Sequence, residues 1–237
     1  MSALRPEILF LHGLWMHGCV FTLHRRRLRE MGWRSHAYSY PSLRGSLAGA
    51  ADGLAAFIAE LDGRPLHLVG HSLGGCVVLD MLARHHPQGI GRIVLLGSPT
   101  RGSYAAQQIL RVPVLRHALG RVLPQWLARP MPEVDPALDI GVIAGNRPIG
   151  LGRIVPGMEK PNDGMVTVSE TRWPGARDHI VLPVTHMQML WSRACLSQAL
   201  RFVDASVAPL SGLVRFTARR ESPPAPCAAL EGPARAG

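Results

Sequence analysis

The chain has 237 residues, of which 47% are hydrophobic and 18% charged, so wholesale disorder is excluded and one domain with a substantial core is expected. Its formal net charge is +10, yet only Lys160 is a lysine and the arginines are scattered. Aromatic residues make up only 5% of the chain, whereas nucleic-acid surfaces usually interleave basic clusters with exposed aromatics. We therefore expect no nucleic-acid partner, while the charge leaves open a peripheral contact with anionic lipid surfaces.

The apolar runs are short. The longest, such as Ile8–Leu11 and Ile93–Leu96, are far below the roughly 20 residues that a membrane-spanning helix needs. The N-terminal sequence has too short an apolar run for a signal peptide. The four cysteines form no C-x-x-C pair and no zinc-ligand spacing, so free thiols are expected. Together these features predict a protein without a transmembrane segment, located in the cytoplasm.

Short apolar runs alternate with helix-like segments. The predicted strands are Glu7–Leu11, Trp33–Tyr40, Leu66–Val69, Arg92–Leu96, Asp139–Ala144 and His179–Val184. The predicted helices are His24–Met31, Leu47–Leu61 with Ser46 as N-cap, Leu73–His85 and Met187–Val203. Such alternation predicts an α/β fold with a mostly parallel central sheet of about six strands and helices on both faces. Ligands of such sheets bind at the carboxyl ends of the strands, so functional residues are expected just after each strand.

Residues 99–136 interrupt this alternation. They contain Pro113, Pro124, Pro130 and Pro132 and two apolar helical stretches, near Ile109–Leu115 and Val122–Leu127, and are interpreted as an insertion. Residues 218–237 are rich in proline, alanine and arginine and lose hydrophobic periodicity, so a disordered tail is predicted. The expected organisation is a single domain over residues 1–217, followed by that tail.

The residues from Gly70 to Gly74 match the pattern G-x-S-x-G, with Ser72 at its centre. Glycines at both ends allow a tight turn that holds a serine hydroxyl above the end of the strand. A predicted strand before the pattern and a predicted helix after it strengthen the interpretation of Ser72 as a nucleophile. The plainer alternative is a glycine-rich turn with an ordinary serine. A phosphate-binding loop is not favoured, because no G-K-S/T follows.

A nucleophilic serine needs a base, and in this architecture the carboxylate and then the histidine follow it in the chain. The later histidines are His85, His86, His117, His179 and His186. The first two end the helix that begins at the serine, His117 lies in the insertion, and His179 begins the last strand. His186 follows the last strand and is therefore the preferred base, with a structural loop histidine as the alternative.

For the carboxylate, Asp163 lies in the turn-prone stretch Pro161-Asn162-Asp163-Gly164, 23 residues before the preferred histidine. The plain alternative is an aspartate that merely stabilises a turn. Competing carboxylates are Asp135, Asp139, Glu159 and Asp178.

Two backbone amides are candidates for stabilising a tetrahedral oxyanion. One is the N–H of Leu73, directly after the serine, and the other is the N–H of Leu14, in the loop after the first strand. Gly13 allows close backbone approach there. His12 is expected to brace this loop rather than to take part in the chemistry.

Over residues 5–205 the chain resembles an α/β-hydrolase of the lipase and esterase type. The resemblance rests on His12-Gly13, the Gly70–Gly75 turn, the Asn162-Asp163-Gly164 stretch and His186, with the segment after Gly97 also matching. It implies Ser72 as nucleophile, Asp163 as acid and His186 as base, with Leu14 and Leu73 as oxyanion donors. It also raises Asp163 above its competitors.

The predicted function is hydrolysis of carboxylic esters through an acyl-enzyme, on a small-molecule substrate and with no metal or organic cofactor. Residues 99–136 are expected to cover the site as a cap or lid. Two alternatives stay open: a thioesterase, amidase or acyltransferase with the same triad, and a catalytically silent hydrolase fold that serves as a binding module. The substrate, its acyl length and the oligomeric state are not predicted.

Overall fold

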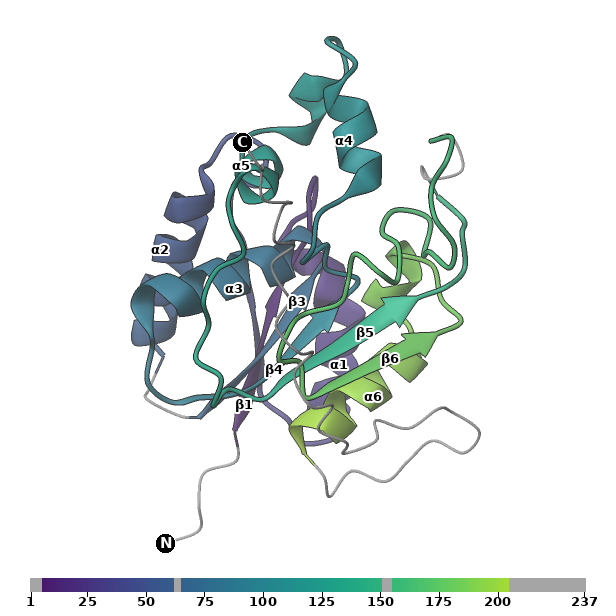
Figure 1. The fold of residues 1–237 in the computed structure, drawn as a ribbon. Coiled ribbons are helices and arrows are strands. Elements are labelled where there is room, and N and C mark those ends of the chain that lie inside the picture. Colours follow the sequence, from purple (N-terminus) through teal and green to yellow (C-terminus); the bar gives the residue numbers. More distant parts are fainter. Residues whose placement is uncertain (1–5, 62–64, 151–154, 205–237) are drawn as a thin grey trace, which may run out of the picture.

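A computed structural model describes residues 6–61, 65–150 and 155–204, and the predicted tail at 218–237 lies outside them. Six strands form one parallel sheet in the order β2-β1-β3-β4-β5-β6 (Figure 1). Their bounds are Glu7–Leu11 (β1), Ser35–Tyr38 (β2), Leu66–His71 (β3), Ile90–Leu96 (β4), Ile140–Gly145 (β5) and Asp178–Leu182 (β6). The expected parallel sheet of about six strands is therefore confirmed.

Helices cover both faces of the sheet. Helices α2 (Leu47–Ala59), α3 (Leu73–His85) and α5 (Val122–Ala128) lie on one face, whereas α1 (Thr22–Glu30) and α6 (Arg193–Val203) lie on the other (Figure 1). Helix α4 (Tyr104–Leu110) stands beyond the carboxyl ends of the strands. The described residues also include the short 3₁₀ helices η1 (Gly18–Phe21), η2 (Arg116–Leu119) and η4 (Met187–Leu190). Because all six strands are parallel, their carboxyl ends lie at the same edge of the sheet.

Two apolar layers hold the sheet between these helices. Successive side chains of a strand point to opposite faces, so Leu9 and Leu11 of β1 pack towards α2 and α3, while Ile8 and Phe10 pack towards α1 and α6. All five residues of β1 are buried, which is typical of a strand covered on both faces. The continuous apolar runs of the sequence reflect this double burial.

Two helix predictions were wrong in their bounds. The expected helix near Ile109–Leu115 lies earlier, as α4, because Ser103 caps its first turn by accepting from the N–H of Ala106 at 3.2 Å. Pro113 disfavours helical geometry at the residue before it, so the helix ends at Leu110. The expected helix Met187–Val203 is divided into η4 and α6, because Ser192 caps a new helix. None of the described helices is long and apolar enough to cross a bilayer.

Candidate active site

Ser72 occupies the turn between β3 and α3, at the carboxyl edge of the sheet. Its backbone has φ 54° and ψ −125°, a conformation that costs a non-glycine residue about 1–3 kcal/mol. The turn closes only because its neighbours are small. A Cβ at Gly70 would lie 2.5 Å from Cα of Gly75, and a Cβ at Gly13 would lie 2.9 Å from Cβ of Ser72. The loop after β1 is therefore pressed against Ser72.

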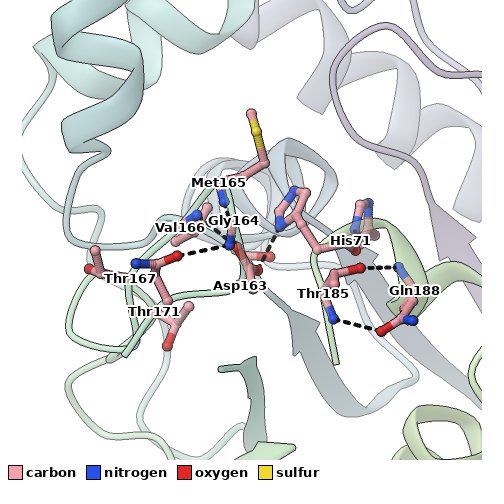
Figure 2. Close-up of polar contacts among 12 residues, drawn as sticks. His71, Asp163, Gly164, Met165, Val166, Thr167, Thr171, Thr185 and Gln188 are labelled. Atoms are coloured by element: carbon pink, nitrogen blue, oxygen red, sulfur yellow. Dashed lines mark hydrogen bonds and ion pairs between the residues drawn. The ribbon is translucent and has the colours of Figure 1, made fainter. Parts of the chain in front are cut away.

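Asp163 and His186 meet beside this turn, although 23 residues separate them in sequence. Nδ1 of His186 lies 2.7 Å from Oδ2 of Asp163, and the carboxylate is completely buried. The other oxygen, Oδ1, accepts from the backbone N–H of Met165 at 2.9 Å and of Val166 at 2.8 Å (Figure 2). Because both oxygens have donors, the carboxylate is held in one orientation, and His186 carries its proton on Nδ1 when neutral.

The backbone adds a second connection between these two residues. The N–H of His186 donates to the carbonyl oxygen of Asp163 at 2.8 Å. Gly97, directly after β4, lies so close that a Cβ there would be 3.0 Å from Oδ2 of Asp163 and 3.2 Å from Nδ1 of His186. Gly97 also has φ 55°, which favours glycine. The ends of β4, β5 and β6 thus define the position of the carboxylate–imidazole pair.

His71, directly before Ser72, supports the same imidazole. It is completely buried, and its Nε2 donates to the carbonyl oxygen of His186 at 3.0 Å, with the two rings 4.7 Å apart between centroids. Burial, and secondly the proximity of His186, holds the pKa of His71 well below the usual histidine value. His71 is therefore neutral near pH 7, and its Nε2–H is a fixed donor.

The loop that carries Leu14 is braced by His12, as the sequence led us to expect. Nε2 of His12 accepts from the N–H of Tyr40 at 3.2 Å, and its Nδ1 donates to the carbonyl oxygen of Gly13 at 2.8 Å. The hydroxyl of Tyr40 donates to the carbonyl oxygen of His12 at 2.9 Å. Burial lowers the pKa of His12, consistent with this neutral tautomer. His12 therefore acts on the shape of the loop.

A cavity of about 280 Å³, which we call the reaction cavity, joins these elements. Ser72 and His186 both line it, as do Leu14 and Leu73, and most of its other lining side chains are apolar. Among the described residues, no hydrogen bond joins the Ser72 hydroxyl to His186. Equally, no described group accepts a hydrogen bond from the backbone N–H of Leu14 or of Leu73. The cavity therefore brings together the Ser72 hydroxyl, one oriented imidazole and two available amide donors.

Residues 8–232 match the alpha/beta hydrolase family. The chain belongs to the α/β-hydrolase family. Among solved structures, the Bacillus licheniformis lipase BlEst2 in its mature form is 22% identical, with a TM-score of 0.66 over 80% of this chain and 88% of the lipase. The NocB thioesterase domain, solved as a covalent complex with a fluorophosphonate nocardicin G analogue, is 16% identical, with a TM-score of 0.57 over 85% of this chain and 96% of that domain.

The product of the ydeN gene of B. subtilis is 17% identical, with a TM-score of 0.56 over 79% of this chain and 92% of that protein. No curated protein sequence matches the chain. At these identities the solved structures are similar in fold, and the functions in their names belong to those proteins. The family and the fold that the sequence resemblance implied are confirmed.

The other titratable candidates lie elsewhere in this α/β-hydrolase. Asp139 pairs with Arg92 at 3.2 Å and with Arg177 at 2.5 Å, beside the start of β5. Asp178 is the first residue of β6, at the same remote edge, rather than preceding the strand. The remaining candidates have local partners or lie on the surface, namely Asp135, Glu159, His85, His86, His117 and His179. Within residues 6–61, 65–150 and 155–204 no group of side chains is arranged to hold a metal ion.

Sequence reasoning missed Glu170, which connects the Asp163 loop of this α/β-hydrolase to α4. Its carboxylate accepts from the backbone N–H of Thr167 at 2.8 Å and from that of Tyr104, and burial raises its pKa. Its own carbonyl accepts from the N–H of Arg101 at 3.0 Å. No sequence pattern marks such a residue, because its partners at 101–104 lie far away in the sequence and only the fold brings them to it.

Proposed function

We propose that the protein is a serine hydrolase that cleaves carboxylic esters through an acyl-enzyme on Ser72. The observation that carries the proposal is the 2.7 Å contact between Asp163 and His186, beside Ser72 in one largely apolar cavity. A buried carboxylate that orients an imidazole next to a serine at a strained strand-to-helix turn is the arrangement that activates a hydroxyl for acyl transfer.

In the proposed reaction, Oγ of Ser72 attacks the acyl carbonyl carbon while Nε2 of His186 takes the hydroxyl proton. Rotation of the serine side chain about Cα–Cβ precedes this step, since no hydrogen bond joins the two groups. The bond between the acyl carbon and the alcohol oxygen then breaks, and His186 returns the proton to the leaving oxygen. Water repeats the sequence: His186 removes its proton, the acid is released, and the serine hydroxyl is restored.

Asp163 and the two free amides stabilise the charges that form. Asp163 keeps the proton of His186 on Nδ1 and stabilises the imidazolium, and its own donors prevent it from turning away. The N–H groups of Leu14 and Leu73 are proposed to bind the oxyanion, where loss of one donor costs about 10²–10³ in kcat. The N-terminus of α3 also favours negative charge there.

Residues 99–136 are proposed as a cap that forms the wall of the acyl site. They contribute to the reaction cavity the side chains of Ser103, Ala105, Ala106, Ile109, Leu119 and Leu123. The cavity volume of about 280 Å³ is near the lower end of the range for ligand sites, roughly 300–1,000 Å³, which favours short acyl chains.

A thioesterase is the second candidate, because the NocB thioesterase domain shares the fold over most of both chains. The same serine, histidine and aspartate would cleave a carbon–sulfur bond in place of a carbon–oxygen bond. A chain-length series of p-nitrophenyl esters, measured beside acyl thioesters of the same lengths, separates the two by their kcat/KM values. We expect the esters to be cleaved faster and the optimum to lie at short chains.

The decisive test is labelling with a fluorophosphonate, which forms a bond between its phosphorus and Oγ of a reactive serine and releases fluoride. We expect labelling of the wild type, no labelling of Ser72→Ala, and a fall in ester hydrolysis of at least about 10⁴-fold in that variant. Ser35→Ala, on the edge strand β2, is the matched control and should behave as the wild type. Well-folded wild type that neither reacts nor hydrolyses any ester would instead favour a binding module.

A further inference from the structure

A second concave surface lies beside the reaction cavity, and arginines dominate its polar lining. This surface, which we call the basic groove, has a volume of about 550 Å³. It is lined by Arg44 from the loop before α2, by Arg116 and His117 of η2, and by Arg121 before α5, with Leu43 and Pro124 between them. Its charged side chains thus come from two segments that are far apart in the sequence.

The backbone fixes these two segments against each other. The N–H of Arg121 donates to the carbonyl oxygen of Leu43 at 2.9 Å. Gly120 approaches the same residue so closely that a Cβ there would lie 2.6 Å from this oxygen. Arg44 and Arg121 are therefore held as neighbours by main-chain contacts, which do not depend on their own side chains.

No acidic side chain offsets this charge. Residues 81–132 contain no aspartate or glutamate at all. Elsewhere in the described chain, arginines pair with carboxylates, as Arg34 does with Glu7 at 3.1 Å and Arg84 with Asp52 at 3.3 Å. None of the three arginines of the basic groove has such a partner within the parts of the chain that the structure describes. Their mutual repulsion is relieved when an anion binds between them.

Shared residues connect the basic groove to the reaction cavity. A third groove, of about 340 Å³, lies between the two. It shares Trp15 and Met16 with the reaction cavity, and it shares Leu43 and Arg44 with the basic groove. A substrate with its carbonyl at Ser72 could therefore extend one end into the apolar cavity and the other along this path. An anionic group would be unpartnered in the apolar cavity, so it belongs at the arginine end.

We propose that the basic groove binds an anionic group on the alcohol or thiol part of the substrate, and that the enzyme therefore prefers esters or thioesters whose leaving group carries a phosphate. This inference rests on the proposed function. Guanidinium groups favour phosphate because their paired N–H donors match its oxygens. The reaction cavity selects the acyl part, whereas the basic groove selects the leaving group.

The test compares substrates that differ only in a phosphate. Suitable pairs are butanoylglycerol with butanoylglycerol phosphate, and butanoyl pantetheine with butanoyl phosphopantetheine, which place the phosphate at two distances from the carbonyl. In the wild type at low salt we expect kcat/KM to be about tenfold or more higher for the phosphorylated member of at least one pair, mainly through KM. Raising the ionic strength should reduce this preference.

Variants assign the preference to the groove. Arg44→Gln and Arg121→Gln should each lower it several-fold and the double variant should abolish it, because kcat/KM falls for the phosphorylated substrates far more than for their neutral twins. Arg29→Gln, on α1, removes the same charge from the other face and should retain the preference. Equal rates for both members of every pair, or a preference that survives in the double variant, would overturn the proposal.

Two further experiments distinguish the proposed leaving-group site from a failure of the proposed function and from binding to a lipid surface. Calorimetric titration of Ser72→Ala with glycerol phosphate and with phosphopantetheine tests the groove without catalysis, so loss of binding is distinguishable from failure of the proposed function. We expect the Ser72→Ala variant to bind at least one of these two compounds. The triple variant that also carries Arg44→Gln and Arg121→Gln should bind neither. Phosphatidylglycerol vesicles provide the membrane control. A preference seen only when the phosphorylated substrate is presented in such vesicles would assign the arginines to a lipid surface and overturn the leaving-group subsite.

Discussion

The loop that carries Asp163 and the 99–136 segment both border the reaction cavity, yet they are held in different ways. Asp163 is completely buried, and its carboxylate has three donors at 2.7–2.9 Å. In the 99–136 segment, Val114 is 84% exposed, and the neighbouring Val112 and Leu115 are exposed as well. The groups proposed to react are thus fixed by several short contacts, whereas residues 112–115 of the other segment project into solvent.

The contacts of the 99–136 segment are concentrated around α5. The indole of Trp126 donates to the carbonyl oxygen of Pro99 at 3.0 Å, and Arg129 pairs with the buried carboxylate of Asp80 on α3. Around η2, by contrast, a single side-chain hydrogen bond among the described residues reaches the loop after β1, from the indole of Trp15 to the carbonyl oxygen of Ala118 at 2.6 Å. Sequence changes near η2 should therefore leave the groups proposed to react undisturbed.

The largest expected effect is a loss of activity when Asp163, in the first of these two regions, is substituted. Asp163→Asn should lower kcat by about 10³–10⁴-fold, because the amide no longer holds His186 in the required tautomer. The matched control is Asp139→Asn, which removes a carboxylate paired with Arg92 and Arg177 at the opposite edge of the sheet. Steady-state kinetics should show an unchanged kcat in the control. Equal losses in both variants would mean that Asp163 acts through stability alone.

A second prediction concerns the attachment of α5. Arg129→Ala leaves the carboxylate of Asp80, 1% exposed, without its partner, so the free energy of unfolding should fall by on the order of 3 kcal/mol. Urea unfolding measures this change. Arg84→Ala, which breaks an exposed pair with Asp52, should change the free energy of unfolding far less. If the 99–136 segment affects substrate binding and the Asp163 loop affects the reaction, the folded Arg129→Ala variant keeps its kcat and has a higher KM.

The smallest expected effect is a loss of stability at acidic pH through His71, which lies next to Ser72. The pKa of His71 is held below 6.5 by burial, so below pH 6.5 the unfolded chain binds a proton that the folded protein does not. Stability should therefore decline as the pH falls below 6.5, by at most about 1.4 kcal/mol per pH unit for this group. Unfolding measured between pH 7.5 and 5 should show a shallower decline in His71→Asn. His117→Asn gives the background for removing one imidazole, and a decline identical in all three proteins would contradict the prediction.

The sequence predicted the sheet well because β1, β3, β4 and β5 are covered on both faces and consist of short, continuous apolar runs. It predicted β2 and β6 with larger boundary errors: Trp33–Tyr40 became Ser35–Tyr38, because an edge strand carries a weaker apolar signal. In the 99–136 segment, the periodicity of leucines and valines predicted a helix near Ile109–Leu115. The helix lies at Tyr104–Leu110 instead, because its bounds depend on the Ser103 cap and on Pro113.

For the candidate site, the order of the motifs along the chain selected Ser72 and His186, whereas Asp163 was raised above its competitors only by the resemblance to α/β-hydrolases. The structure places all three at one edge of the sheet. Their catalytic roles, and those of Leu14 and Leu73, stay proposals. His71 was visible only as the variable position of G-x-S-x-G, and Glu170 had no signal at all. Both act through backbone groups of distant segments, and only tertiary structure creates such contacts.

The sheet order has a consequence for biosynthesis. Ser72 precedes α3 near the centre of the sheet, whereas His186 follows β6, the last strand and an outer edge. During translation the serine emerges long before the imidazole that is proposed to activate it, and α6 must still pack behind β4 and β5. On the proposed mechanism, a ribosome-bound chain stays inactive through most of its synthesis, and the onset of ester hydrolysis would report that the final strand has docked.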